Sequence, residues 1–134
     1  MKKPFSDKLQ AIKLNSGAYQ LKIRINQSKV ISIGKLGSFE FACGVYVYTG
    51  SAMKNLRSRI ERHLLKDKLL KWHIDFLLND ESAEIIDIEI FESDEKEECG
   101  INLLTHLHKQ STFPVAKFGS SDCNVCPSHL QKIG

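Results

Sequence analysis

The chain lacks any long hydrophobic run. No apolar stretch among its 134 residues approaches the roughly 18 residues that a membrane-spanning helix needs. The beginning, MKKPFSDKLQ, has two lysines, but the apolar segment that should follow them in a signal peptide is missing. These absences predict a cytoplasmic protein that has no membrane partner.

Repeats and low-complexity tracts are absent as well, and cysteines are few. The length fits one domain of the usual size, roughly 100 to 200 residues. Four cysteines are present, and without a sign of export reduced thiols or metal ligands are favoured over disulfides. We therefore expect one domain over residues 1–134, which ends in a cysteine-containing tail at about 117–134.

The net charge is only +3, but one segment has few acidic residues and another has almost no basic ones. Residues 53–73 contain seven basic and two acidic side chains, and residues 80–98 contain ten acidic and one basic. Charge runs are most often solvated surfaces. The basic run, however, follows a glycine-terminated strand, where free amides and the helix dipole favour an anion such as phosphate. We expect the residues that contact nucleic acid to be Gly50, Ser51, Lys54, Arg57 and Arg62.

Hydrophobic periodicity predicts an α+β fold, a small and mostly antiparallel sheet flanked by helices. Alternation predicts strands at 17–25, 30–33, 39–49 and 84–91, the first two as an antiparallel hairpin and the third with a possible bulge at Gly44. Amphipathic patterns predict helices at 53–66, capped by Ser51, and at 71–80. A capping box of Asp94 and Glu97 predicts a helix through about 109, with leucines on its buried side at Leu103, Leu104 and Leu107.

Two helix residues and two strand residues are candidates for chemistry. Arg59 and His63 are one helical turn apart and lie near the edge of the apolar stripe. If Tyr19 and Tyr48 come from neighbouring strands, their phenols meet this guanidinium and this imidazole at the sheet end. Such a group suits phosphodiester cleavage, in which a water must be activated and a charged phosphate neutralised, usually with help from a metal.

The order of these residues resembles the GIY-YIG nuclease superfamily. Its first element corresponds to Gly17-Ala18-Tyr19 and its second to Tyr48-Thr49-Gly50, with Arg59 and His63 in the following helix. The sequence is most similar to the uncharacterised branch catalogued as a domain of unknown function, number 123, sometimes found joined to endonuclease III-like repair enzymes. This likeness runs through YVYTGSA, RIERH, WHID, the Glu98-Cys99 pair and FGSSDC, and so covers nearly the whole chain.

The resemblance implies a role for each matching residue. Tyr19 would help activate the attacking water, Tyr48 would position water or phosphate, and Arg59 would stabilise charge on the phosphate. His63 would transfer a proton or bind phosphate, and His73 of WHID would be a second active-site histidine. A helix glutamate, Glu98 or its rival Glu97, would hold one Mg²⁺ or Mn²⁺ ion, in keeping with the hard oxygen ligands that these ions prefer.

The implied function is that of a metal-dependent endonuclease, a hydrolase that cleaves DNA in repair or in structure-specific processing and has a possible repair-protein partner. The sequence also departs from the superfamily pattern. Ala18 and Thr49 replace isoleucines, and 28 residues between Tyr19 and Tyr48 predict an additional hairpin. One more residue than usual before Arg59 leaves Arg57 and Arg62 as competitors for its role.

The tail permits two readings. Cys123, Cys126 and His129 have the spacing of zinc ligands, with a fourth from Cys99 or Cys43, although structural zinc sites normally show two clear ligand pairs. Alternatively, the polar loop around Asp122 closes over the phosphate pocket. Two further functions stay open beside the nuclease: a non-catalytic nucleic-acid-binding module, and an interaction domain stabilised by zinc.

Overall fold

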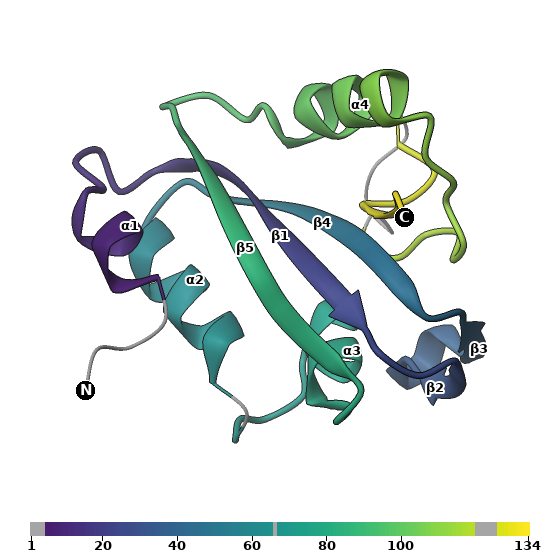
Figure 1. The fold of residues 1–134 in the computed structure, drawn as a ribbon. Coiled ribbons are helices and arrows are strands. Elements are labelled where there is room, and N and C mark those ends of the chain that lie inside the picture. The colour runs from purple at the N-terminus through teal and green to yellow at the C-terminus, as the bar shows by residue number, and fades with distance from the viewer. Residues whose placement is uncertain (1–4, 66, 120–125) are drawn as a thin grey trace.

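A four-stranded antiparallel sheet forms the centre of the computed structural model, which describes residues 5–65, 67–119 and 126–134. Its strand order is β5-β1-β4-β6 (Figure 1). The strands are β1 (Gly17–Ile25), β4 (Gly44–Ala52), β5 (Ala83–Glu92) and β6 (Leu130–Lys132). The predicted α+β class is confirmed. The strand β1, which shows the strong alternation in the sequence, lies inside the sheet and has partners on both edges.

In the sequence, a separate small hairpin comes between β1 and β4. It consists of β2 (Lys29–Ser32) and β3 (Ser38–Phe41), with the 3₁₀ turn η1 (Gly34–Leu36) between them. The additional hairpin is therefore present, but the predicted pairing of 17–25 with 30–33 is wrong, because both edges of β1 are occupied by β4 and β5. The single strand predicted at 39–49 is also divided, since Gly44 at φ 148° begins a new strand.

Helices cover both faces of the sheet (Figure 1). The helix α2 (Leu56–Leu64) faces the Tyr19 side, where Tyr19 and His63 are hydrogen-bonded. The helix α4 (Glu98–Lys109) faces the opposite side, where the adjacent residue Gln20 donates to Thr105. Successive strand residues point to opposite faces, so these two contacts assign the two helices to different layers.

Two short helices complete the α2 layer. The helix α1 (Ser6–Gln10) precedes β1, and α3 (His73–Asn79) follows α2. The predicted apolar stripe of α2 is confirmed by the full burial of Leu56 and Ile60, which join a core that includes Ile74 and Leu77 of α3. The predicted Ser51 cap is wrong, because β4 continues through Ala52 and α2 begins only after Asn55.

The interior side of α4 is polar, contrary to the sequence prediction. Leu104 and Leu107 are 55% and 73% exposed, whereas Asn102 is fully buried. The Asn102 amide donates to the Ser128 carbonyl at 2.8 Å and accepts from Gln131 at 2.6 Å, so hydrogen bonds replace apolar packing here. The predicted Asp94–Glu97 capping box is also wrong, because α4 begins at Glu98 and Glu97 makes no side-chain cap.

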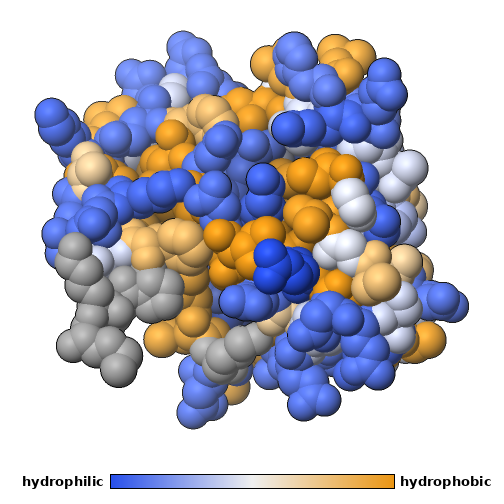
Figure 2. Space-filling model, viewed as in Figure 1, coloured by the Kyte–Doolittle hydropathy of each residue, from blue (hydrophilic) through white to orange (hydrophobic). Residues whose placement is uncertain are grey.

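A groove of about 320 Å³ lies between α4 and the sheet, lined by residues such as Ile88 and Leu104. Figure 2 shows hydrophobic surface in the middle of this view, with hydrophilic side chains around it. Among the described residues, none of the helices has the length and the apolar composition that crossing a membrane requires.

Candidate active site

Tyr19 and Gly50 face each other across the central pair of strands. They are register partners in the β1–β4 ladder, which confirms that Tyr19 and Tyr48 come from neighbouring strands. A Cβ atom on Gly50 would lie 2.6 Å from the Tyr19 hydroxyl and 2.7 Å from its Cζ atom. Glycine is therefore required at residue 50 by the position of the Tyr19 ring. The two tyrosine ring centroids are 6.5 Å apart.

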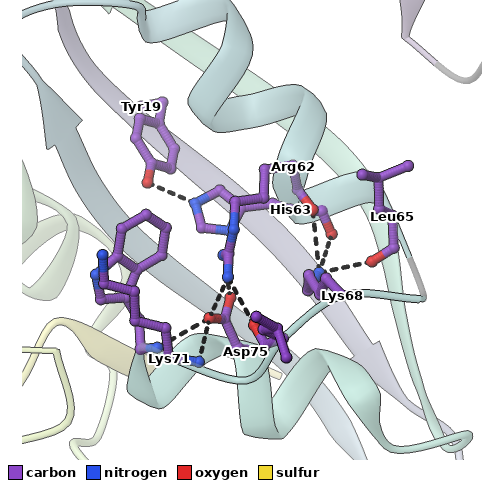
Figure 3. Close-up of polar contacts among 9 residues, drawn as sticks. Tyr19, Arg62, His63, Leu65, Lys68, Lys71 and Asp75 are labelled. Atoms are coloured by element: carbon purple, nitrogen blue, oxygen red, sulfur yellow. Dashed lines mark hydrogen bonds and ion pairs between the residues drawn. The ribbon is translucent and has the colours of Figure 1, made fainter.

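Tyr19 and His63 form a buried hydrogen-bonded pair (Figure 3). The Tyr19 hydroxyl lies 2.7 Å from His63 Nε2, and the two residues are 1% and 2% exposed. Burial raises the pKa of Tyr19 well above its ordinary value and lowers the pKa of His63 to about 3. Both side chains are therefore neutral at pH 7, and one hydrogen bond joins the hydroxyl to Nε2. Within the described part of the chain, the buried His63 Nδ1 has no hydrogen-bond partner.

Arg59 is the arginine that lies next to the tyrosines. Its guanidinium donates from Nη1 to the Ser51 carbonyl at 3.2 Å. Its positive charge partly offsets the effect of burial, which raises the pKa of Tyr19. It also lies 4.5 Å from the centre of the Trp72 ring, within cation–π range. The competitor Arg57 points elsewhere, because its side chain donates to the carbonyls of Leu9 and Ile12, around the end of α1.

The second competitor, Arg62, forms an ion pair with Asp75 at 2.7 Å (Figure 3). Asp75 is completely buried. Burial opposes ionisation of Asp75, but hydrogen bonds from Arg62 and from the Trp72 and Lys71 amides outweigh it and lower the pKa. Asp75 therefore fixes the backbone at Trp72, which in turn contacts Arg59.

Glu98 reaches the pocket from the opposite layer. The Ser51 hydroxyl donates to Glu98 Oε2, and the Ser51 carbonyl accepts from Arg59, so one strand residue connects the carboxylate with the guanidinium. Burial is the main cause that raises the pKa of Tyr48, and the negative charge of Glu98 is the second. The rival Glu97 is exposed at the N-terminal end of α4. The geometry thus places Glu98, and not Glu97, beside the tyrosines.

His73 lies at the rim of the pocket. Its Nδ1 accepts a hydrogen bond from the Gly119 amide at 2.9 Å, and its ring contacts Phe118, which in turn contacts Tyr48. Gly119 has a φ of 68°, and a Cβ atom there would lie 2.9 Å from the Tyr48 ring. The chain at 118–119 therefore covers Tyr48, while Asp122 and Cys123 lie outside the described residues.

The remaining predicted residues are distributed around this centre. Lys54 is exposed between β4 and α2. Cys126 and His129 gather with Cys99, whereas Cys43 is exposed before β4. Sequence patterns did not identify Trp72 and Asp75 as supports of Arg59, because the only local signal, the WHID order, does not reveal a partner on another helix.

Comparison with known proteins identifies one family. A family model described as "Domain of unknown function DUF123" matches residues 18–134. No curated protein and no solved structure matches the chain. The chain belongs to the DUF123 family, whose match spans every residue of the pocket from Tyr19 to Glu98.

Proposed function

We propose that this protein is an endonuclease of the GIY-YIG superfamily, which hydrolyses phosphodiester bonds in DNA with one divalent metal ion. The observation that carries the proposal is the convergence of five groups on one pocket. Tyr19 and His63 are hydrogen-bonded to each other, and the Tyr48 ring packs beside both. Arg59 and Glu98 are connected through their hydrogen bonds to Ser51, and the charges of both act on Tyr19.

The pocket has the charge that a phosphodiester requires. Arg59 supplies a permanent positive charge next to the Tyr19 hydroxyl, and its stacking on Trp72 leaves little freedom to move. A preorganised cation of this kind stabilises the charge that develops on phosphate oxygens in the transition state. Contact with Ser51 and Trp72 thus prepares Arg59 for phosphate before any substrate binds.

A divalent metal fits Glu98 by the chemistry of its donor atoms. One carboxylate oxygen, Oε2, accepts from the Ser51 hydroxyl, and the other oxygen would be the donor for the metal. Magnesium and manganese commonly use one or two carboxylates together with waters and substrate oxygens. When bound, the ion would polarise the scissile phosphate and lower the pKa of a coordinated water.

Tyr19 and His63 provide a route for the proton of the attacking water. Because His63 is neutral at pH 7, Nε2 can accept the Tyr19 proton while the Tyr19 oxygen accepts one from the water. The water oxygen then bonds to phosphorus, the bond to the leaving sugar oxygen breaks, and that oxygen takes a proton from solvent. His63, whose pKa is about 3, gives the extra proton back to solvent. The raised Tyr19 pKa favours this transfer over a free phenolate.

The test is cleavage of branched, nicked and single-stranded DNA, and of RNA, with Mg²⁺ or Mn²⁺. We expect Tyr19→Phe, Arg59→Lys and Glu98→Gln each to lower the rate by about 100-fold or more. The matched controls are Tyr46→Phe, which loses a hydroxyl bonded to the Ala42 carbonyl, and Glu97→Gln, which loses an exposed carboxylate. Full activity in Tyr19→Phe and Glu98→Gln would refute the catalytic assignment.

A non-catalytic nucleic-acid-binding module is the second candidate. It is favoured by the burial of Tyr19 and His63, which leaves the partly exposed Arg59 and Ser51 as the accessible phosphate ligands. This candidate predicts DNA binding that weakens steeply with salt, no cleavage of any substrate, and weaker binding by Arg59→Lys.

A further inference from the structure

Two cysteines and one histidine gather on the α4 side of the C-terminal segment. Cys99 belongs to the first turn of α4, Cys126 lies in the segment that leads to β6, and His129 directly precedes β6. Their side-chain ligand atoms all lie within 4.8 Å of one another. Cys126 and His129 are 2% and 4% exposed, so the cluster is largely shielded from solvent.

The distances suit a tetrahedral metal centre. With Zn–S near 2.3 Å and Zn–N near 2.05 Å, a tetrahedron separates sulfur from nitrogen by about 3.6 Å and two sulfurs by about 3.8 Å. Cys99 Sγ and His129 Nε2 are 3.5 Å apart, which matches one edge. The other two pairs of ligand atoms are at most 4.8 Å apart, so these atoms would have to approach each other by about 1 Å at most.

The imidazole is already oriented as a metal ligand. Its Nε2 atom lies 3.5 Å from Cys99 Sγ. The His129 backbone is fixed too, since its amide donates to Phe118 at 2.8 Å and its carbonyl accepts from Thr49 at 3.0 Å.

We propose that Cys99, Cys126 and His129 bind one zinc ion. Two thiolates and one imidazole form a soft donor set, which selects zinc over the hard ions that suit Glu98. Of the ligands that the sequence suggests, Cys126 and His129 come from the tail and Cys99 from α4, while Cys123 lies outside the described residues. The ion fastens the first turn of α4, and with it the neighbouring Glu98, to the C-terminal segment.

The test measures metal content in the full-length protein and makes no use of nuclease activity. We expect about one zinc per chain in the wild type, and loss of it in Cys99→Ser, Cys126→Ser and His129→Gln. The control variants Cys43→Ser and His108→Gln, both at exposed residues, should retain it.

Cobalt provides a second measurement if the ligand variants do not fold. Titration of the metal-stripped wild type with Co²⁺ should give intense thiolate charge-transfer bands and the d–d bands of tetrahedral cobalt. The proposal is overturned if the wild type binds neither zinc nor cobalt stoichiometrically, or if Cys43→Ser abolishes binding. It is overturned equally if folded Cys99→Ser and Cys126→Ser retain the wild-type zinc content.

Discussion

Replacement of Gly50 by alanine should displace the Tyr19 side chain. The new Cβ atom would lie 2.6 Å from the Tyr19 hydroxyl, and since ordinary contacts begin at 3.4 Å, the two must separate by 0.8 Å. Tyr19 is 1% exposed and has no free space into which to move without repacking. Overpacking of this kind costs about 1–3 kcal/mol, and loss of the hydrogen bond to His63 adds about 1 kcal/mol. We therefore expect a destabilisation of about 2–4 kcal/mol.

Urea denaturation measures this change in the free energy of unfolding. Gly100→Ala is the matched control, because a Cβ atom at this α4 residue meets nothing within 4 Å and alanine favours the helix by about 1 kcal/mol. In a Tyr19→Leu background, which removes the clashing ring atoms, Gly50→Ala should cost less than about 0.5 kcal/mol. A cost that is the same in both backgrounds would show that Tyr19 is not the reason for glycine here.

Two other expectations concern buried ionisable groups. Because the pKa of His63 is about 3 in the folded protein and 6.5 ordinarily, the unfolded chain binds the extra proton, so stability is full above pH 6.5 and falls as the pH decreases toward 3. The loss between pH 7 and pH 5 should be about 2 kcal/mol by denaturation, and His63→Gln should remove that share of the pH dependence. Asp75→Asn should lower the free energy of unfolding by about 2–3 kcal/mol, the low end for a broken buried pair because Arg62 is 26% exposed. Asp87→Asn, which breaks the exposed ion pair with Lys8, should lower the free energy of unfolding by less than about 1 kcal/mol. Equal costs for the two variants would contradict the role assigned to Asp75.

Local patterns predicted the elements better than their pairing. The alternation over residues 17–25 is the pattern of β1, and the stripe of Leu56 and Ile60 is the buried face of α2. Residues 30–33 follow β1 closely in the sequence, and this favoured a hairpin between the two. One edge of β1 is instead occupied by β5, which begins more than 50 residues after β1 ends. Turn signals act over a few residues, so they cannot report a competitor for an edge that lies so far along the chain.

The same distinction applies to the pocket. The shared helical face of Arg59 and His63 is a local property, and both are found beside Tyr19 as the spacing predicts. The burial of Asp75 depends on an arginine from another helix. The buried Asn102 depends on Gln131, which reaches it from β6. Neither residue stands in an apolar pattern, so hydrophobic periodicity gives no sign of its interior position.

The position of β1 in the middle of the sheet also affects synthesis of the chain. The strand β4 ends at residue 52 and β5 at residue 92, so the ribosome makes 40 more residues before the second edge of β1 can pair. At translation rates of about 5–20 residues per second, this interval lasts about 2–8 s. During it the nascent protein exposes an unpaired strand edge rich in isoleucine and leucine, the kind of surface that promotes aggregation and attracts chaperones.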